Sequence, residues 1–190
     1  YLDQLDLERE RGITIKMAPV RMVYRPRQSA NSKAQSDNDL RLAISDLQNS
    51  EFILNLIDTP GHSDFSYEVS RALAAVEGAV LLVDATQGIQ AQTLAKFEAA
   101  KGAKLVILGA VNKVDAASSE QIENSKTEIS QLLGIKKEEI SEISGKTGKG
   151  VTELLERIIK ETPPPRSGGG SESGFSRALI FDSLYDDHKG

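Results

Sequence analysis

Short apolar runs that end in polar turns recur along the chain, and they predict strands. The runs occupy residues 53–57, 79–83, 105–111 and 140–143. Apolar segments of roughly four to eight residues, bounded by turn residues, are typical of strands that are buried on both faces of a sheet. We therefore expect a mostly parallel sheet.

Helical segments alternate with these runs. The predicted helices occupy residues 64–76, 90–101, 118–134 and 151–159. Ser118 and Gln121 have the spacing of a capping box, and Gly134 is a typical residue just past the end of a helix. Strands that alternate with helices of this length predict an α/β fold with helices on both faces of the sheet.

The region before residue 51 has a different pattern. Residues 2–12 are charged with a few leucines, which predicts the end of an amphipathic helix. Residues 17–24 predict a strand, which Pro19 restricts to a sheet edge or a bulge. The polar segment 25–50 then predicts a long connection between two antiparallel strands, either a solvated expansion or a docking loop.

Composition and charge narrow the class of protein. The chain has 190 residues, no cysteine, 39% hydrophobic residues and a net charge of −5. Disulfides and thiolate metal sites are excluded, and the acidic balance argues against a broad basic face for DNA. The apolar runs are too short for a transmembrane helix, which needs about 20 apolar residues. We expect a soluble protein with one sizeable domain and part of another.

The C-terminal region predicts a domain boundary. Prolines and glycines crowd residues 163–170, which is typical of a linker, and residues 176–184 again predict a strand. The expected parts are a first domain over 1–162, a linker over 163–174 and the start of a second domain over 175–190. Because the chain begins with Tyr1 and not with methionine, we also expect it to be a fragment.

Residues with the chemistry of a phosphate site follow the first apolar run. Asp58 ends the strand predicted at 53–57, and Gly61 and His62 lie in the next turn. Ligands of parallel α/β sheets bind beyond the carboxyl ends of the strands. A carboxylate there can hold Mg²⁺ through water, and a glycine lets a backbone N–H approach a phosphate. The simpler interpretation is an ordinary turn beside a surface histidine.

Two further loops have the chemistry of a guanine site. The carboxylate of Asp115 can accept two parallel hydrogen bonds from the N1–H and the exocyclic amine of guanine, a pattern that adenine lacks. Asn112 would brace the loop and the base edge, and the stem of Lys113 would cover the ring. The segment Ser144-Gly145-Lys146 supplies a backbone N–H for guanine O6. Taken alone, each segment could be a solvated turn.

Taken in their order along the chain, the candidate segments resemble the motifs of a known family. The ordered segments are Arg11–Ile15, Asp58–His62, Asn112–Asp115 and Ser144–Lys146. In this order the chain resembles a translational GTPase, and within that superfamily it most resembles the LepA family, also called elongation factor 4. The closer likeness lies in Leu5–Lys16, Asp64–Arg71, Pro163–Pro165 and Ala178–Ser183.

The resemblance implies a translational G domain of the P-loop NTPase type that binds GTP with Mg²⁺ and hydrolyses GTP. Thr14 would ligate Mg²⁺ and close over the γ-phosphate, and Asp58 would hold the same ion through water. Gly61 would contact the γ-phosphate through its N–H, and His62, the catalytic residue, would orient the attacking water. The strand over 176–184 would begin a β-barrel second domain.

The chain departs from the family pattern at several points. Gly145 stands where the family has alanine, and Ser63 where it has valine, a change for which we have no physical explanation. No Gly-x-x-x-x-Gly-Lys-Ser/Thr phosphate loop occurs, because Ile140 stands where a loop ending at Thr147 would need its first glycine. We expect this loop and its central strand upstream of Tyr1, so that the isolated chain binds GTP poorly and folds incompletely.

More than one function is compatible with these features. The first is a ribosome-stimulated GTPase that acts in back-translocation or in the fidelity of protein synthesis. The alternatives are a guanine-nucleotide-switched ribosome-binding module without useful turnover, or a related GTPase of the elongation factor G or BipA type. A nucleotide-binding protein that recognises a base other than guanine is disfavoured by Asp115. The resemblance implies the ribosome as partner, a monomer, and a cytoplasmic location with peripheral membrane association as a further option.

Overall fold

The computed structural model describes residues 18–26, 51–59 and 66–164. The chain divides into two compact units, Tyr1–Thr59 and Pro60–Gly190. Several predictions fall on residues outside the described ranges. These are the helix over 2–12, most of the polar segment 25–50, the linker, the second-domain strand, and the sites at Thr14, Gly61 and His62.

The first unit contains an antiparallel pair of strands. β1 (Ala18–Tyr24) pairs with β2 (Phe52–Asp58) along the full length of both strands. Beyond the strand ends, Arg25 and Glu51 form an ion pair at 2.5 Å. The prediction of two antiparallel strands on either side of the polar segment is therefore confirmed.

The burial predicted for β2 is wrong. The side chains of Ile53 and Leu56 are 50% and 41% exposed, and the partner of β2 is the antiparallel β1. An apolar run indicates a strand but does not identify its neighbour, because parallel and antiparallel pairing satisfy the same backbone groups.

The second unit is built on a parallel sheet. Its strands are β3 (Gly78–Asp84), β4 (Val106–Asn112) and β5 (Ser141–Glu142), in the order β3-β4-β5. β5 is shorter than the predicted run 140–143. The chain enters it from a 3₁₀ turn (Lys137–Glu139), and the backbone C=O of Ile143 already accepts a bond from the loop residue Val114, at 3.3 Å.

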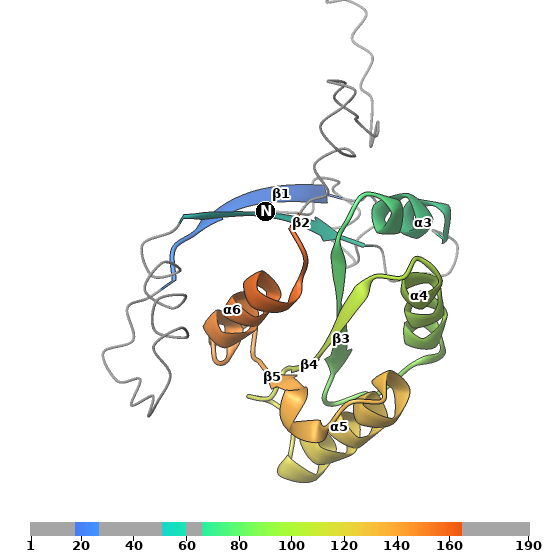
Figure 1. The fold of residues 1–190 in the computed structure, drawn as a ribbon. Helices are drawn as coiled ribbons and strands as arrows, with labels where there is room; N and C mark the ends of the chain where they lie inside the picture. Colours follow the sequence, from blue (N-terminus) through green and yellow to red (C-terminus); the bar gives the residue numbers. More distant parts are fainter. Residues whose placement is uncertain (1–17, 27–50, 60–65, 165–190) are drawn as a thin grey trace, which may run out of the picture. The chain divides into compact units, whose positions relative to one another are not determined.

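Helices cover both faces of this sheet, as predicted (Figure 1). The helices are α3 (Ser66–Ala74), α4 (Ala91–Gly102), α5 (Ser119–Leu133) and α6 (Val151–Glu161). Phe97 of α4 and Ile129 of α5 pack against one face of the sheet. Leu154 of α6 packs with Ala110 and Ile143 on the other face.

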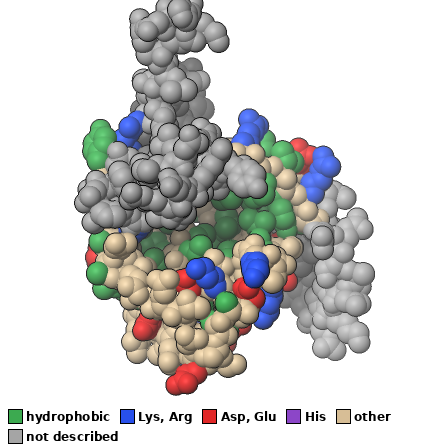
Figure 2. Space-filling view, turned by 180° about the vertical axis from the view of Figure 1, so that it is seen from behind, with side chains coloured by type: hydrophobic (Ala, Val, Ile, Leu, Met, Phe, Trp, Pro, Cys, Tyr) green, Lys and Arg blue, Asp and Glu red, His purple; other side chains and the backbone are tan. Residues whose placement is uncertain are grey.

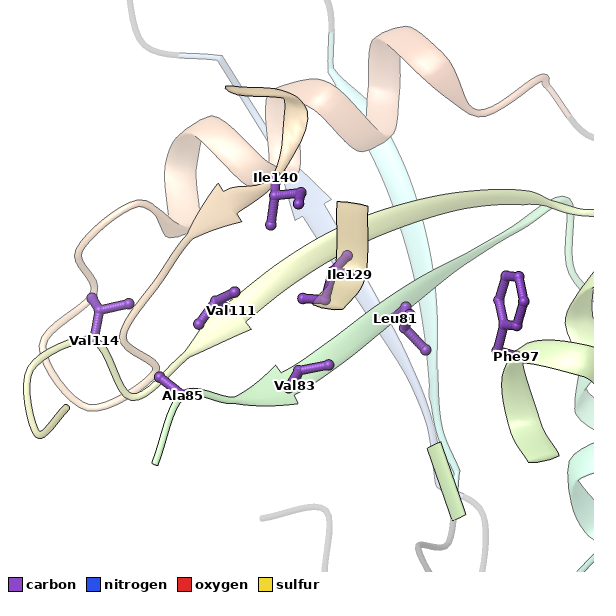
Figure 3. Packing of buried hydrophobic residues seen from close by; sticks show 8 residues of the cluster. All are labelled: Leu81, Val83, Ala85, Phe97, Val111, Val114, Ile129 and Ile140. Carbon is purple, nitrogen blue, oxygen red and sulfur yellow. The ribbon is translucent and has the colours of Figure 1, made fainter. Parts of the chain in front are cut away.

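The larger core lies between β3, β4 and the helices α4 and α5 (Figure 3). Ile129 is fully buried, and it packs with Leu81, Val83 and Val111 from the strands. Val114, from the loop after β4, belongs to the same cluster. The loop that carries the candidate site is thus anchored in the core by an apolar side chain.

The predicted limits of α5 are confirmed. The Ser118 hydroxyl accepts the N–H of Gln121 at 3.2 Å, and the Gln121 side chain accepts the N–H of Ser118 at 2.9 Å. Gly134 closes the helix in the left-handed conformation, with φ 68°. Both signals are local, so neighbouring residues in the sequence suffice to predict them.

Apolar side chains also remain at the surface of the described part of the chain, as the green atoms in Figure 2 show. On β3, Val80 and Leu82 are 37% and 50% exposed, whereas Leu81 and Val83 are buried. This alternation follows the two faces of a strand. None of the helices in the described residues has the length and apolar character needed to cross a membrane.

Replacing Gly150 by alanine is expected to lower the free energy of unfolding by about 3 kcal/mol. Gly150 has φ 69°, and an added Cβ would lie 2.0 Å from the backbone oxygen of Glu142. Gly148→Ala is the matched control, because Gly148 has φ 80° but no atom within 4 Å of an added Cβ. That control should cost only about 1 kcal/mol. Hydrogen exchange of β4 and α6 amides in rising urea measures both changes, and equal losses would contradict the steric explanation.

Candidate functional site

Neighbouring parallel strands bring polar residues to one edge of the sheet. β3 ends at Asp84 and β4 at Asn112, and these two residues are partners in the strand register. A cavity of about 300 Å³ opens between the loops that follow β4 and β5. It is lined by Asn112, Lys113, Asp115, Ala116, Gly145 and Lys146. Apart from Ala116, all of these belong to the residues predicted for guanine.

The loop after β4 is held by its own backbone. Lys113 adopts the left-handed conformation with φ 63°, and its C=O accepts the N–H groups of Ala116 at 2.9 Å and Ala117 at 3.2 Å. Val114 is 8% exposed and donates its N–H to Ile143. With its neighbours fixed in this way, Asp115 presents an exposed side chain to the cavity.

Ser144 ties the two loops together. The Ser144 side chain is fully buried, and its hydroxyl donates to Asp115 Oδ1 at 2.6 Å. The Ser144 Oγ also accepts the N–H of Thr147 at 3.1 Å. Its backbone N–H donates to Lys149, and its C=O accepts from Gly148. Ser144 therefore acts on the cavity through Asp115, since it does not line the cavity itself.

Asn112 braces the loop after β5 by accepting the N–H of Gly145 at its Oδ1, with an N···O distance of 3.0 Å. This bond occupies the amide of Gly145. The N–H of Lys146 has no hydrogen-bond partner among the described residues, and Lys146 lines the cavity. Of these two loop amides, that of Lys146 is therefore the one left for a carbonyl of a ligand.

The departure at Gly145 has little steric consequence. An alanine Cβ there would meet the nearest atom, Asn112 Oδ1, at 3.8 Å, which is an ordinary contact. The residue is not among those with positive φ. The loop accordingly has room for the family's alanine and keeps its backbone bond with glycine.

The ionised form of Asp115 is favoured in this loop. The hydrogen bond from Ser144 is the main cause that lowers the pKa of Asp115 below its ordinary value of 3.8, and the charges of Lys146 and Lys113 contribute in the same direction. Each carboxylate oxygen has two acceptor positions. Oδ1 can therefore accept a second bond, and no other described residue is bonded to Oδ2.

Replacing Ser144 by alanine is expected to raise the pKa of Asp115 toward 3.8, because the largest lowering cause is removed. In the wild-type protein the lowered pKa favours the folded loop above the ordinary pKa, and this contribution disappears as the pH falls through the lowered value. A carbon-detected NMR titration of the Asp115 carboxyl measures the change. Ser130→Ala is the control, because it removes a serine bond to Ile135 elsewhere in the fold; an equal shift in that variant would contradict the assignment.

Asp84 is a site residue that the sequence reasoning missed. Its Oδ2 lies 2.7 Å from the Nζ of Lys113, so a carboxylate holds the ammonium group of this cavity-lining lysine. Partial burial raises the pKa of Asp84, but hydrogen bonds from Lys113 and Thr86 outweigh it and lower the pKa overall. Its position as the last residue of a strand, like that of Asp58 and Asn112, is the signal that could have identified it.

The predicted phosphate and metal residues are described only in part. Asp58 is the last residue of β2 in the first unit, whereas Thr14, Gly61 and His62 lie outside the described residues. Asp58 has the oxygen ligand that Mg²⁺ prefers. Over 18–26, 51–59 and 66–164, no group of three or more His, Asp or Glu side chains is arranged to hold a metal ion.

Comparison with known proteins finds relatives of this chain. Residues 1–164 match the family model for the elongation factor Tu GTP binding domain. Over all 190 residues the chain is 48% identical to a protein named elongation factor 4 from Syntrophomonas wolfei, and it covers 28% of that relative. The chain therefore spans little more than a quarter of the length of such relatives.

Solved structures of elongation factors share the fold. A bacterial selenocysteine-specific elongation factor has a TM-score of 0.63 at 24% identity, covering 84% of this chain and 24% of the other. The elongation factor SelB from Methanococcus maripaludis, in complex with the GTP analogue GppNHp, has a TM-score of 0.53 at 26% identity. That match covers 59% of this chain and 26% of the other.

Proposed function

Because the chain belongs to the elongation factor Tu GTP binding domain family, we propose that it is the nucleotide-binding part of a GTPase that acts on the ribosome in the manner of elongation factor 4. The observation that carries the proposal is the cavity between the loops after β4 and β5. Asp115, which is held by Ser144, and Lys146 both line this cavity, and this pair supports a guanine base as the ligand.

Guanine fits the donors and acceptors of this cavity. Asp115 accepts the N1–H and the exocyclic amine of the base, and its bond from Ser144 leaves enough acceptor positions for both. The N–H of Lys146 donates to O6. The stem of Lys113 covers one face of the ring while Asp84 holds its ammonium. Adenine offers an acceptor at N1 and a donor at C6, so it would leave the Asp115 carboxylate unpaired.

For the phosphate end of the nucleotide we propose the roles that the family resemblance implies. Thr14 and Asp58 would hold Mg²⁺, Asp58 through water, Gly61 would contact the γ-phosphate, and His62 would orient the attacking water. Bound Mg²⁺ neutralises charge that develops on the transferred phosphoryl group. The protein contributes mainly geometry to such a reaction. The elongation factor SelB is in complex with the GTP analogue GppNHp, which supports GTP as the ligand of this domain.

The remaining assignments concern the parts of the protein around this domain. We propose that residues 1–162 form the GTP-binding domain, 163–174 a linker and 175–190 the start of a β-barrel second domain; the family match over 1–164 supports the first boundary. Since elongation factors act on ribosomes, we place the protein in the cytoplasm. A monomeric state and peripheral membrane association stay predictions.

Phosphate release from GTP by the intact protein that contains this chain tests the proposal. Hydrolysis should be slow alone and should rise on the order of 10²-fold or more when ribosomes are added, since positioning effects of that size are usual. Tight GTP binding with no increase on ribosomes would favour the nucleotide-switched binding module instead. Absence of GTP binding by the intact protein would contradict both functions.

A further inference from the structure

Asp84 is surrounded by hydrogen-bond donors although it does not line the cavity. Its Oδ1 accepts the N–H of Thr86 at 2.9 Å and the Thr86 hydroxyl at 2.7 Å. Its Oδ2 forms an ion pair with Lys113 Nζ at 2.7 Å and accepts a hydrogen bond from Gln87 Nε2 at 3.3 Å. The side chain is 20% exposed, against 56% for Lys113. The carboxylate is therefore the more fixed partner of the ion pair.

The turn that carries Asp84 is anchored without help from Lys113. The backbone C=O of Asp84 accepts hydrogen bonds from the N–H groups of Gln87 at 3.0 Å and Gly88 at 2.9 Å. From α5, Glu128 Oε2 accepts the N–H of Ile89 at 2.9 Å. The N–H of the following Ala85 donates to Asn112 at 2.9 Å and so continues the strand pairing. These bonds make Asp84 an anchor that is fixed relative to the end of β4.

Lys113 needs such an anchor. With φ 63° its backbone lies in the left-handed region, which disfavours residues with a side chain. Asn112 precedes it and Asp115 follows it by two positions, so a change in the Lys113 backbone would turn both side chains relative to each other. The ion pair restrains the end of the Lys113 side chain, while the bonds to Ala116 and Ala117 restrain its C=O.

We propose that Asp84 is a positioning residue for guanine recognition, which it serves by holding Lys113 in the left-handed conformation that directs Asp115 and Asn112 into the cavity. The inference rests on the proposed function, because it assigns Asp84 a part in the selectivity of that site. A residue that only stabilised the turn 84–88 would change stability without changing the choice of base.

The affinities of the intact protein for GDP and IDP test the inference. Inosine lacks the exocyclic amine, so the GDP:IDP ratio reports the contact made by Asp115. Asp84→Asn keeps the size of the side chain and an acceptor for Thr86 but removes the charge. We expect it to lower GDP affinity about tenfold and to reduce the GDP:IDP ratio several-fold. Thr86→Val removes a turn bond and leaves the ion pair, so it should leave the ratio unchanged.

The outcomes separate the inference from the proposed function. If the wild-type protein does not prefer GDP to IDP, both are overturned. If it does, and Asp84→Asn has the wild-type ratio, only the role of Asp84 is overturned. Should Asp84→Asn not fold, Asp84→Glu keeps the charge and is expected to hold the ratio within about twofold of wild type; a collapsed ratio in that folded variant would contradict the inference.

Discussion

Replacing Asp115 by asparagine is expected to lower the affinity of the intact protein for GDP by on the order of 10³-fold and to create affinity for xanthosine diphosphate. The carboxylate accepts two hydrogen bonds from guanine, whereas an asparagine side chain has one acceptor and one donor group. Xanthine has a carbonyl where guanine has the exocyclic amine, so it matches the asparagine donor. Titration of fluorescent guanosine and xanthosine diphosphates measures both changes.

The control for this variant is Glu120→Gln, which neutralises an exposed carboxylate in the first turn of α5. GDP affinity should stay within about twofold of wild type, because isolated surface charges contribute little. An Asp115→Asn protein that is folded and binds GDP as tightly as wild type would exclude Asp115 from base recognition.

Replacing His62 by alanine is expected to reduce ribosome-stimulated GTP hydrolysis by on the order of 10²-fold or more, with little change in GTP affinity. The reason is that a side chain that orients the attacking water contributes to the transition state and adds little to nucleotide binding. Rapid-mix measurement of phosphate release on ribosomes gives the rate, and equilibrium titration gives the affinity.

His188→Ala is the matched control, since His188 is the other histidine of the chain and lies in the segment proposed as the second domain. Its hydrolysis rate should equal that of wild type. If His62→Ala also hydrolyses GTP at the wild-type rate on ribosomes, His62 has no catalytic role, and the nucleotide-switched binding module becomes the better description.

The sequence predicted the second unit well because its signals are local or periodic. The Ser118 capping box and the Gly134 cap are read from adjacent residues, and both occur in the structure. The resemblance to the elongation factor 4 family was likewise predicted from short motifs, and the identity over the full chain confirms it. The burial of β2 was predicted less well: its antiparallel pairing with β1 was expected, but the apolar side chains of Ile53 and Leu56 are exposed.

For the proposed guanine site, the sequence was enough to predict which loops come together. Asn112, Asp115 and Ser144 were selected by motif, and the parallel strands bring their loops together. Sequence reasoning could not assign individual hydrogen bonds. It did not foresee that the Asn112 side chain accepts a hydrogen bond from the backbone N–H of Gly145. It also missed Asp84, because the pairing of Asp84 with Lys113 depends on strand register.

Competition of unlabelled GDP, IDP and ADP against a fluorescent guanine nucleotide on the intact protein tests the guanine site most directly. The structure predicts that GDP competes best, that IDP is weaker because it lacks the amine for Asp115, and that ADP is weaker by on the order of 10⁴-fold. Displacement by ADP at concentrations within about tenfold of those needed for GDP would contradict a guanine site between the loops after β4 and β5.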